Sequence, residues 1–143
     1  MRYTIVAVGK LKERFWVQAC AEYVKRLGAY GKVDVREVPD IDPARAGGVE
    51  ASRSREGQEI LSAIPERSHV ILLAIYGKQR GSEEFSAHLD ELVLRGKSDL
   101  SFVIGGSDGV SPEVRARANE TFSFGPITPP HNLARGVLLQ QLY

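Results

Sequence analysis

The sequence has one cysteine, no long apolar run and almost no net charge, and each of these shortages excludes a class of protein. Cys20 is the only cysteine among 143 residues, so no disulfide can form within the chain. No stretch approaches the roughly 18 apolar residues of a membrane-spanning helix, and the N-terminus does not have the pattern of a signal peptide. We therefore expect a cytoplasmic protein without a membrane span.

Charge is balanced over the whole chain but not along it. The formal net charge is +1, from 19 Lys and Arg against 18 Asp and Glu, which argues against binding nucleic acid by charge alone. Residues 1–36 nevertheless hold eight of the cations and three of the acids, a local excess of 8 − 3 = +5. This basic end either contacts phosphate or is a set of solvated side chains, and the sequence favours neither reading.

Apolar runs typical of strands alternate with amphipathic stretches typical of helices. Strands are expected at residues 3–9, 33–38, 70–75, 100–104 and 121–124. Residues 70–75 form the most apolar run and should lie centrally, whereas residues 33–38 alternate in polarity, as near a sheet edge. The chain is long enough for one hydrophobic core. The pattern predicts a single α/β domain over residues 1–143 with a largely parallel sheet.

Apolar stripes and capping residues predict the helices between these strands. Residues 39–48 are expected to be a loop, and the helices to span residues 49–64 and about 132–143 and to begin near Ser82 and Ser111. Another helix follows the first strand, with a stripe of Phe15, Ala19, Tyr23 and Leu27. Cys20 lies within that stripe and is interpreted as a core residue rather than a nucleophile. The stripe expected to be buried in the helix near Ser82 is Phe85, Leu89, Leu92 and Val93.

Three loops follow strand ends, where ligands bind in parallel sheets. They are residues 76–78, 105–109 and 125–131. The glycines of the second loop stand at relative positions 0, 1 and 4, which does not match the 0, 2 and 5 of a dinucleotide fingerprint, and no P-loop is present. Glycine lets a ligand approach the backbone closely, although a tight turn would use the same residues.

The third loop contains three prolines, Pro126, Pro129 and Pro130. Prolines fix φ and lower the entropy cost of holding one shape, while the non-proline residues keep their amide donors. Such a loop suits recognition of a flat base such as adenine, and it would equally serve as a rigid connector to the last helix. The histidines His69, His88 and His131 show no metal-ligand spacing, so the first two are interpreted as structural and no metal is expected.

At these loops the sequence resembles a known family. The matching motifs are Val6-Ala7-Val8-Gly9-Lys10, Glu56-Gly57 with Ile60-Leu61, Gly77-Lys78, Ile104-Gly105-Gly106-Ser107-Asp108-Gly109, Thr128 with Pro130-His131, and Leu138 with Leu142-Tyr143. In this order and spacing they resemble the pseudouridine N3-methyltransferases of the large-subunit ribosomal RNA, small members of the SPOUT superfamily. Each motif is weak alone, but together they cover nearly the whole chain.

The resemblance implies a deep trefoil knot near the C-terminus, which general fold rules would not suggest. It also implies that S-adenosylmethionine binds in that knot, without metal, and that the acceptor is a pseudouridine of ribosomal RNA in the large subunit or the 70S ribosome. The implied ligand contacts are Leu73, Gly105, Gly106, Pro126, Ile127, Thr128, Pro129, Pro130 and His131. No catalytic residue is assigned.

A homodimer is implied as well, with the last helix in its interface. That helix has a broad apolar surface, from Leu133, Val137, Leu138 and Leu142. Two alternatives stay open at this stage. One is a non-catalytic knotted module that binds the ribosome or RNA, and the other is an unrelated α/β enzyme acting on a small molecule.

The sequence departs from the family pattern in three places. Ala74 stands where the family usually has an acidic residue, and Pro129 where it usually has leucine. Family members also continue past the Leu-Tyr pair with a tail of aromatic, His and Arg residues, whereas this sequence is given to Tyr143. From the sequence we therefore expect the family tail, and with it part of the RNA site, to be absent.

Overall fold

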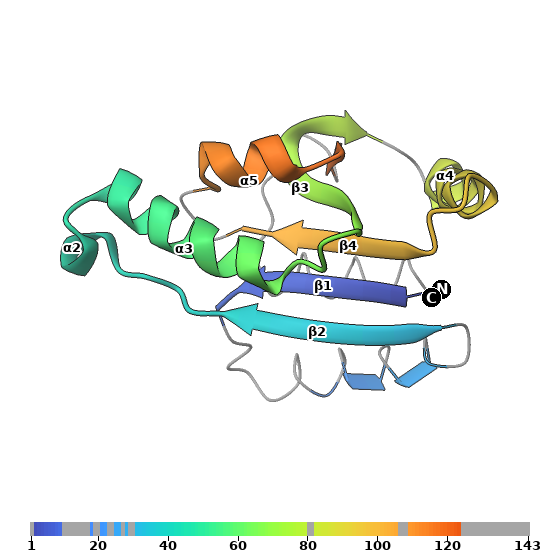
Figure 1. Cartoon of the computed structure of the whole chain (residues 1–143), viewed down its shortest axis with the longest axis horizontal. Helices are drawn as coiled ribbons and strands as arrows, with labels where there is room; N and C mark the ends of the chain where they lie inside the picture. Colours follow the sequence, from blue (N-terminus) through green and yellow to red (C-terminus); the bar gives the residue numbers. More distant parts are fainter. Residues whose placement is uncertain are drawn as a thin grey trace.

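The strands of the computed structural model form one sheet in the order β2-β1-β4-β3-β5 (Figure 1). The structure describes residues 2–9, 31–79, 82–105 and 109–123, with Gln18, Ala21, Glu22, Lys25, Arg26 and Gly28. The strands are β1 (Arg2–Val8), β2 (Lys32–Val38), β3 (His69–Gln79), β4 (Asp99–Ile104) and β5 (Glu120–Ser123). All four strand pairings are parallel, which confirms the predicted α/β class.

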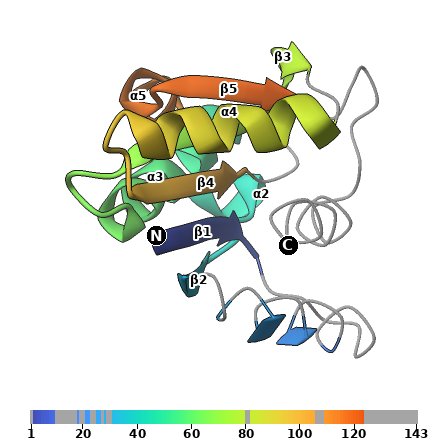
Figure 2. The same cartoon turned by 90° about the vertical axis from the view of Figure 1, so that its right-hand side faces the viewer.

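Helices cover both faces of the sheet. They are α2 (Pro43–Ala46), α3 (Val49–Ala63), α4 (Ser82–Leu94) and α5 (Pro112–Arg117). Helix α4 lies on one face, and α3 and α5 lie on the other (Figures 1 and 2). None of the helices in the described ranges is both long and apolar enough to cross a membrane.

The core is divided by the sheet into two clusters. Side chains alternate between the faces of a strand, so Ile5 of β1 packs toward α4 while Val6 packs toward α3 and α5. On the α4 side the helix contributes Phe85, Leu89 and Leu92. Val93, expected in the same buried stripe, is 44% exposed because it points away from the sheet. That prediction was wrong for Val93 alone.

The segment expected to be a loop over residues 39–48 contains a short helix, α2. The Asp42 side chain accepts a hydrogen bond from the Ala44 amide at 3.1 Å, and Pro43 supplies a helical φ at the first position. Gly47, with φ of 94°, then ends the helix in the left-handed conformation. The signals for a helix were present, but four residues are too few to show an apolar stripe.

The predicted start of α5 is confirmed. Ser111 is its N-cap and accepts from the Val114 amide, with Pro112 in the first turn. Some other predictions fall on residues that are not described. Helical residues at 18, 21, 22, 25 and 26 agree with the predicted helix after β1, but its apolar stripe and Cys20 lie outside the described residues, as do residues 124–143 with the last helix and the predicted knot.

Candidate functional site

The carboxyl ends of the five described strands meet at one edge of the sheet, because every pairing between them is parallel. One register row crosses the sheet near this edge and contains Glu37, Ala7, Ile104, Leu73 and Phe122, from β2 through to β5. In open parallel sheets ligands bind just beyond such an edge. The row therefore marks where a ligand site is expected, and it brings together segments far apart in the sequence.

Two of the predicted ligand contacts, Leu73 and Gly105, are neighbours at this edge. Leu73 pairs with Ile104, and Gly105 is the next residue of the chain after Ile104. On its other side Leu73 pairs with Phe122, one residue before the end of β5. Gly106 and the proline loop from Pro126 to His131 lie outside the described residues, so their part in the site stays a prediction.

Gly105 directly follows β4 and packs closely on Val110. A Cβ added to this glycine would lie 2.6 Å from Val110 Cγ1, so a larger residue would displace one of the two. Gly109 has φ of 84°, a conformation that favours glycine. Local packing and backbone conformation therefore favour glycine at both positions, whether or not a ligand also approaches Gly105.

Residues 76–78 were predicted to be a ligand loop, and this prediction was wrong about their conformation. They belong to β3, which continues to Gln79 and bends near its end (Figure 1). The β3–β5 pairing jumps from Leu73 to Lys78, and both of these residues pair with Phe122. The intervening residues 74–77 form an irregular excursion at the ligand edge.

Gly77 makes this excursion possible. A Cβ at this position would lie 2.7 Å from the Phe122 amide nitrogen and 2.8 Å from the Phe122 carbonyl carbon. These are backbone atoms of a paired strand and have little freedom to move. The Gly77-Lys78 motif is thus explained by close packing of β3 on β5 rather than by a loop.

Helix α3 holds the segment that follows β2. The Glu56 carboxylate accepts a hydrogen bond from the Ile41 amide at 2.8 Å, and the Ser52 hydroxyl donates to the Ile41 carbonyl at 2.6 Å. Both side chains are buried, at 5% and 2% exposed. Sequence reasoning recognised Glu56-Gly57 only as a motif, because the contact joins residues 15 positions apart.

Helix α3 also braces the segment that follows β4. Gly57 lies so close to α5 that an added Cβ would overlap Ser111 Oγ and lie 3.0 Å from Ser111 Cβ. Ser111 in turn caps α5, in the segment that follows Gly105. One helix therefore supports the segments after two strands of the ligand edge.

The two described histidines lie away from the ligand edge. His69 starts β3, and both His69 and His88 contact Glu120, the first residue of β5. Within the ranges that the structure describes, no group of three or more His, Cys, Asp or Glu side chains is arranged to hold a metal ion. His69 and His88 are separated in sequence, and the fold brings them together at the amino end of the sheet.

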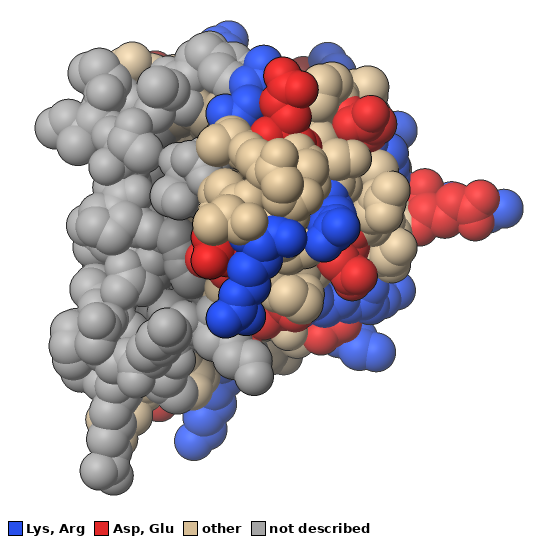
Figure 3. Space-filling view, turned by 90° about the vertical axis from the view of Figure 1, so that its left-hand side faces the viewer, with Lys and Arg blue, Asp and Glu red and all other residues tan. Residues whose placement is uncertain are grey.

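The described surface on the α2 side of the molecule carries charges of both signs. Figure 3 looks onto this side and shows Lys and Arg interspersed with Asp and Glu. Over the described part of this face, phosphate would therefore meet no single extended positive area.

Comparison with known proteins identifies the family. A family model described as "Predicted SPOUT methyltransferase" matches residues 1–143. The chain belongs to the SPOUT methyltransferase family. Its relatives include the "Ribosomal RNA large subunit methyltransferase H" of Listeria monocytogenes serotype 4a (strain HCC23), 51% identical over 146 residues that cover 100% of this chain and 92% of that protein. The protein of the same name from Bacillus thuringiensis (strain Al Hakam) is 50% identical over 147 residues, with the same coverage.

Membership of the SPOUT methyltransferase family confirms the resemblance drawn from the motifs. The family also indicates which kind of ligand to expect, since a methyltransferase must hold a methyl donor. The edge where Leu73 meets Gly105 is the part of the described fold that parallel-sheet geometry favours for it.

Proposed function

We propose that this SPOUT methyltransferase transfers a methyl group from S-adenosylmethionine to N3 of a pseudouridine in large-subunit ribosomal RNA, acting on the assembled ribosome. The observation that carries the proposal is the match of the whole chain to relatives of about 50% identity that are named as methyltransferases of large-subunit ribosomal RNA. A ribosomal substrate also implies action in the cytoplasm.

The described part of the ligand edge fits a donor of this kind. Leu73, Ala74 and Gly105 are half-buried at this edge and carry apolar or no side chains, with Leu73 packed toward α4 and Ala74 toward α3 and α5. Residues 74–77 leave the regular β3–β5 ladder at the same edge. Leu73 and Gly105 would hold the donor from the sheet side, and Gly106 with Pro126, Ile127, Thr128, Pro129, Pro130 and His131 would complete the site.

Methyl transfer to a ring nitrogen places modest demands on the protein. S-adenosylmethionine would supply a methyl group on a positively charged sulfur: a bond from N3 to the methyl carbon would form as the carbon–sulfur bond breaks in line, leaving the neutral thioether S-adenosylhomocysteine. The enzyme must align this group with the acceptor nitrogen and assist loss of the N3 proton. No metal is needed for this chemistry, and Gly105, which has no side chain, would help to align the donor rather than supply acid–base catalysis.

The RNA acceptor is expected to be recognised in the context of the ribosome. The chain has a net charge of only +1, so attraction to phosphate is weak and naked RNA should bind poorly. A homodimer would enlarge the contact surface, and we propose that the last helix forms its interface. The knot is part of the same proposal, because the donor would bind in it.

The test is methyl transfer to ribosomes that lack this modification. Purified protein is incubated with methyl-labelled S-adenosylmethionine and separately with 70S ribosomes, large subunits and protein-free ribosomal RNA. The labelled RNA is digested to nucleosides and analysed by mass spectrometry. We expect one N3-methylpseudouridine per ribosome, and little label in protein-free RNA.

Other outcomes would change the assignment. Ribosome binding without methyl incorporation would indicate the non-catalytic module. Label in a different nucleoside would retain the methyltransferase but contradict the pseudouridine N3 assignment. Absence of both donor binding and ribosome binding would contradict the proposal as a whole.

A further inference from the structure

Three titratable side chains meet at the amino end of β5, in a cluster that the proposed reaction does not use. The Glu120 carboxylate lies between two imidazoles, with Oε2 2.8 Å from His69 Nε2 and Oε1 2.6 Å from His88 Nε2. All three side chains are largely buried, at 23%, 13% and 15% exposed. An imidazole can donate its Nε2 proton to a carboxylate whether it is neutral or charged. We call this cluster the histidine bridge.

The histidine bridge joins three elements on the α4 face of the sheet. His69 belongs to β3, His88 to α4 and Glu120 to β5. Two residues further along β5, Phe122 packs against Phe85 of α4, with ring centroids 4.7 Å apart. Strand β5 is therefore fixed to α4 at two points, one polar and one aromatic.

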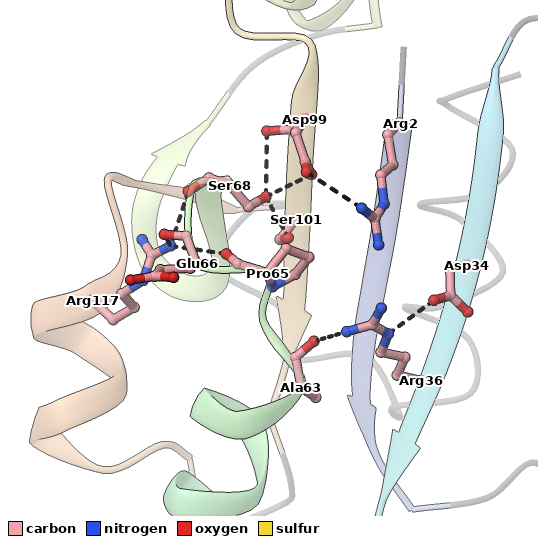
Figure 4. A network of polar contacts seen from close by, with 10 residues as sticks. All are labelled: Arg2, Asp34, Arg36, Ala63, Pro65, Glu66, Ser68, Asp99, Ser101 and Arg117. Atoms are coloured by element: carbon pink, nitrogen blue, oxygen red, sulfur yellow. Dashed lines mark hydrogen bonds and ion pairs between the residues drawn. The ribbon is translucent and has the colours of Figure 1, made fainter.

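The segment leading into β5 is also fixed to β3 and to the turn before it. The Asn119 side chain accepts from the Val70 amide at 2.7 Å, and its own amide donates to the Val70 carbonyl at 2.8 Å. Arg117 donates to the Pro65, Glu66 and Ser68 carbonyls at 3.4, 3.2 and 3.0 Å, so it holds the turn that leads into β3 (Figure 4).

The histidine bridge adds a side-chain anchor to the backbone pairing that places β5 along β3. It has four residues and is the outermost of the described strands on its side of the sheet. Its regular pairing with β3 covers Ile71, Leu72 and Leu73 before the jump to Lys78. Its far end, Ser123, lies three residues before Pro126 of the proposed donor loop.

We propose that the histidine bridge positions the methyl-donor site by fixing β5 lengthwise on β3 and α4. The inference rests on the proposed function, since it assumes that the segment after β5 contacts the donor. Glu120, His69 and His88 are then positioning residues: they contact neither donor nor acceptor but set where the donor loop begins. Transfer reactions are sensitive to such placement, because a shift on the order of 1 Å can lower the rate about a hundredfold.

The test compares donor binding in three variants with the wild type by calorimetry. Glu120→Ala removes both hydrogen bonds of the bridge. Glu120→Gln keeps a group that accepts from one imidazole and donates to the other after a change of tautomer. Glu66→Ala is the matched control, because Glu66 is exposed, lies at the same end of the sheet and carries the same charge. We expect Glu120→Ala to weaken S-adenosylmethionine binding about tenfold, equal to about 1.4 kcal/mol, with the other two near wild type.

Kinetics separate positioning from simple loss of stability. A positioning role predicts that Glu120→Ala raises KM for S-adenosylmethionine and leaves KM for ribosomes unchanged. Partial unfolding would instead lower kcat with both KM values unchanged, and that result would overturn the proposal. If Glu120→Ala does not fold, His88→Ala retains the contact of Glu120 with His69 and should show a smaller rise in the same KM. Wild-type affinity for S-adenosylmethionine in both Glu120→Ala and His88→Ala would also overturn the proposal.

The experiment distinguishes failure of this inference from failure of the proposed function. If the wild type binds the donor and Glu120→Ala binds it equally well, the positioning role is wrong and the proposed function stands. If the wild type does not bind S-adenosylmethionine, the proposed function is contradicted and the positioning role with it.

Discussion

Gly57 is the residue at which α3 and α5 come closest. An added Cβ would overlap Ser111 Oγ and contact Val114 Cγ2 at 3.4 Å. In an exposed helix, Gly→Ala raises stability by about 0.5–1 kcal/mol. Here overpacking, together with the loss of the Ser111 cap, should outweigh that gain. We expect Gly57→Ala to lower the free energy of unfolding by about 1–2 kcal/mol in urea titration.

The control for this prediction lies on the same helix. Ser54 is exposed, so Ser54→Ala should change stability by less than about 0.5 kcal/mol. A Gly57→Ala protein as stable as the wild type would show that α3 and α5 can separate without cost, and the bracing role given to α3 would be wrong.

Tyr3 makes the stability of the protein sensitive to alkaline pH. Burial, and secondarily the charge of Asp90, raise the pKa of its phenol above the ordinary 10.0. The folded state then holds this proton more tightly than the unfolded state. Stability from this source is complete below pH 10 and is lost as pH rises toward the folded pKa, by at most about 1.4 kcal/mol per pH unit.

The variant Tyr3→Phe removes this titration. Urea unfolding at pH 9 and pH 11 should show a smaller loss of stability in Tyr3→Phe than in the wild type, and Asp90→Asn should fall between them. Equal losses in all three proteins would mean that Tyr3 ionises as readily when folded as when unfolded.

Some contacts between single residues could not be predicted from the sequence. His69 and His88 were interpreted as structural, but the sequence did not show their common partner Glu120, which lies 51 and 32 positions away. The contact between Glu56 and Ile41, 15 positions apart, could not be predicted from the sequence either. Such pairs depend on how strands and helices are placed in space, which local patterns do not encode.

At the scale of elements, the close packing of β3 on β5 shapes the ligand edge. Gly77 allows it, because a Cβ there would lie 2.7 Å from the Phe122 amide nitrogen. We expect Gly77→Ala to displace β5 and to weaken S-adenosylmethionine binding at least about tenfold in calorimetry. Gln79→Ala, an exposed position of the same strand, is the control. Unchanged affinity in Gly77→Ala would show that the packing of β5 on β3 does not affect the donor site.

The sequence was most informative where an element is set by its own residues. Strands β1, β4 and β5 follow from apolar runs, β2 follows from alternating polarity, and α5 follows from the Ser111-Pro112 cap. The sequence was least informative where a tertiary contact determines the extent of an element. Strand β3 extends past Ile75 because Lys78 and Gln79 pair again with β5, and the missing side chain of Gly77 permits this close contact.

At the scale of the whole molecule, the alternation of strands and helices predicted a parallel sheet but not its order. The order β2-β1-β4-β3-β5 places Leu73 beside Gly105, and this juxtaposition is what turns two separate motifs into one candidate site. The family was identified by the resemblance of the motifs, because composition and periodicity alone did not indicate it.

The proposed homodimer is a property of the whole molecule. Light scattering at micromolar concentration should return about twice the chain mass of 15.7 kDa. Replacing the apolar Leu138 and Leu142 by aspartate should yield the monomer, because charges in an apolar interface are costly to bury. Gln140→Asp adds a charge without removing an apolar side chain and serves as the control. A wild-type mass near that of one chain would contradict the dimer.

The central claim is that the ligand edge where Leu73 meets Gly105 holds S-adenosylmethionine. Calorimetric titration of the wild type and of Gly106→Val, each with and without EDTA, tests it most directly. We predict saturable binding to the wild type that EDTA does not change, and at least about tenfold weaker binding to Gly106→Val, because a β-branched side chain would block the close approach of the donor. Equal affinity in the two proteins would contradict the claim.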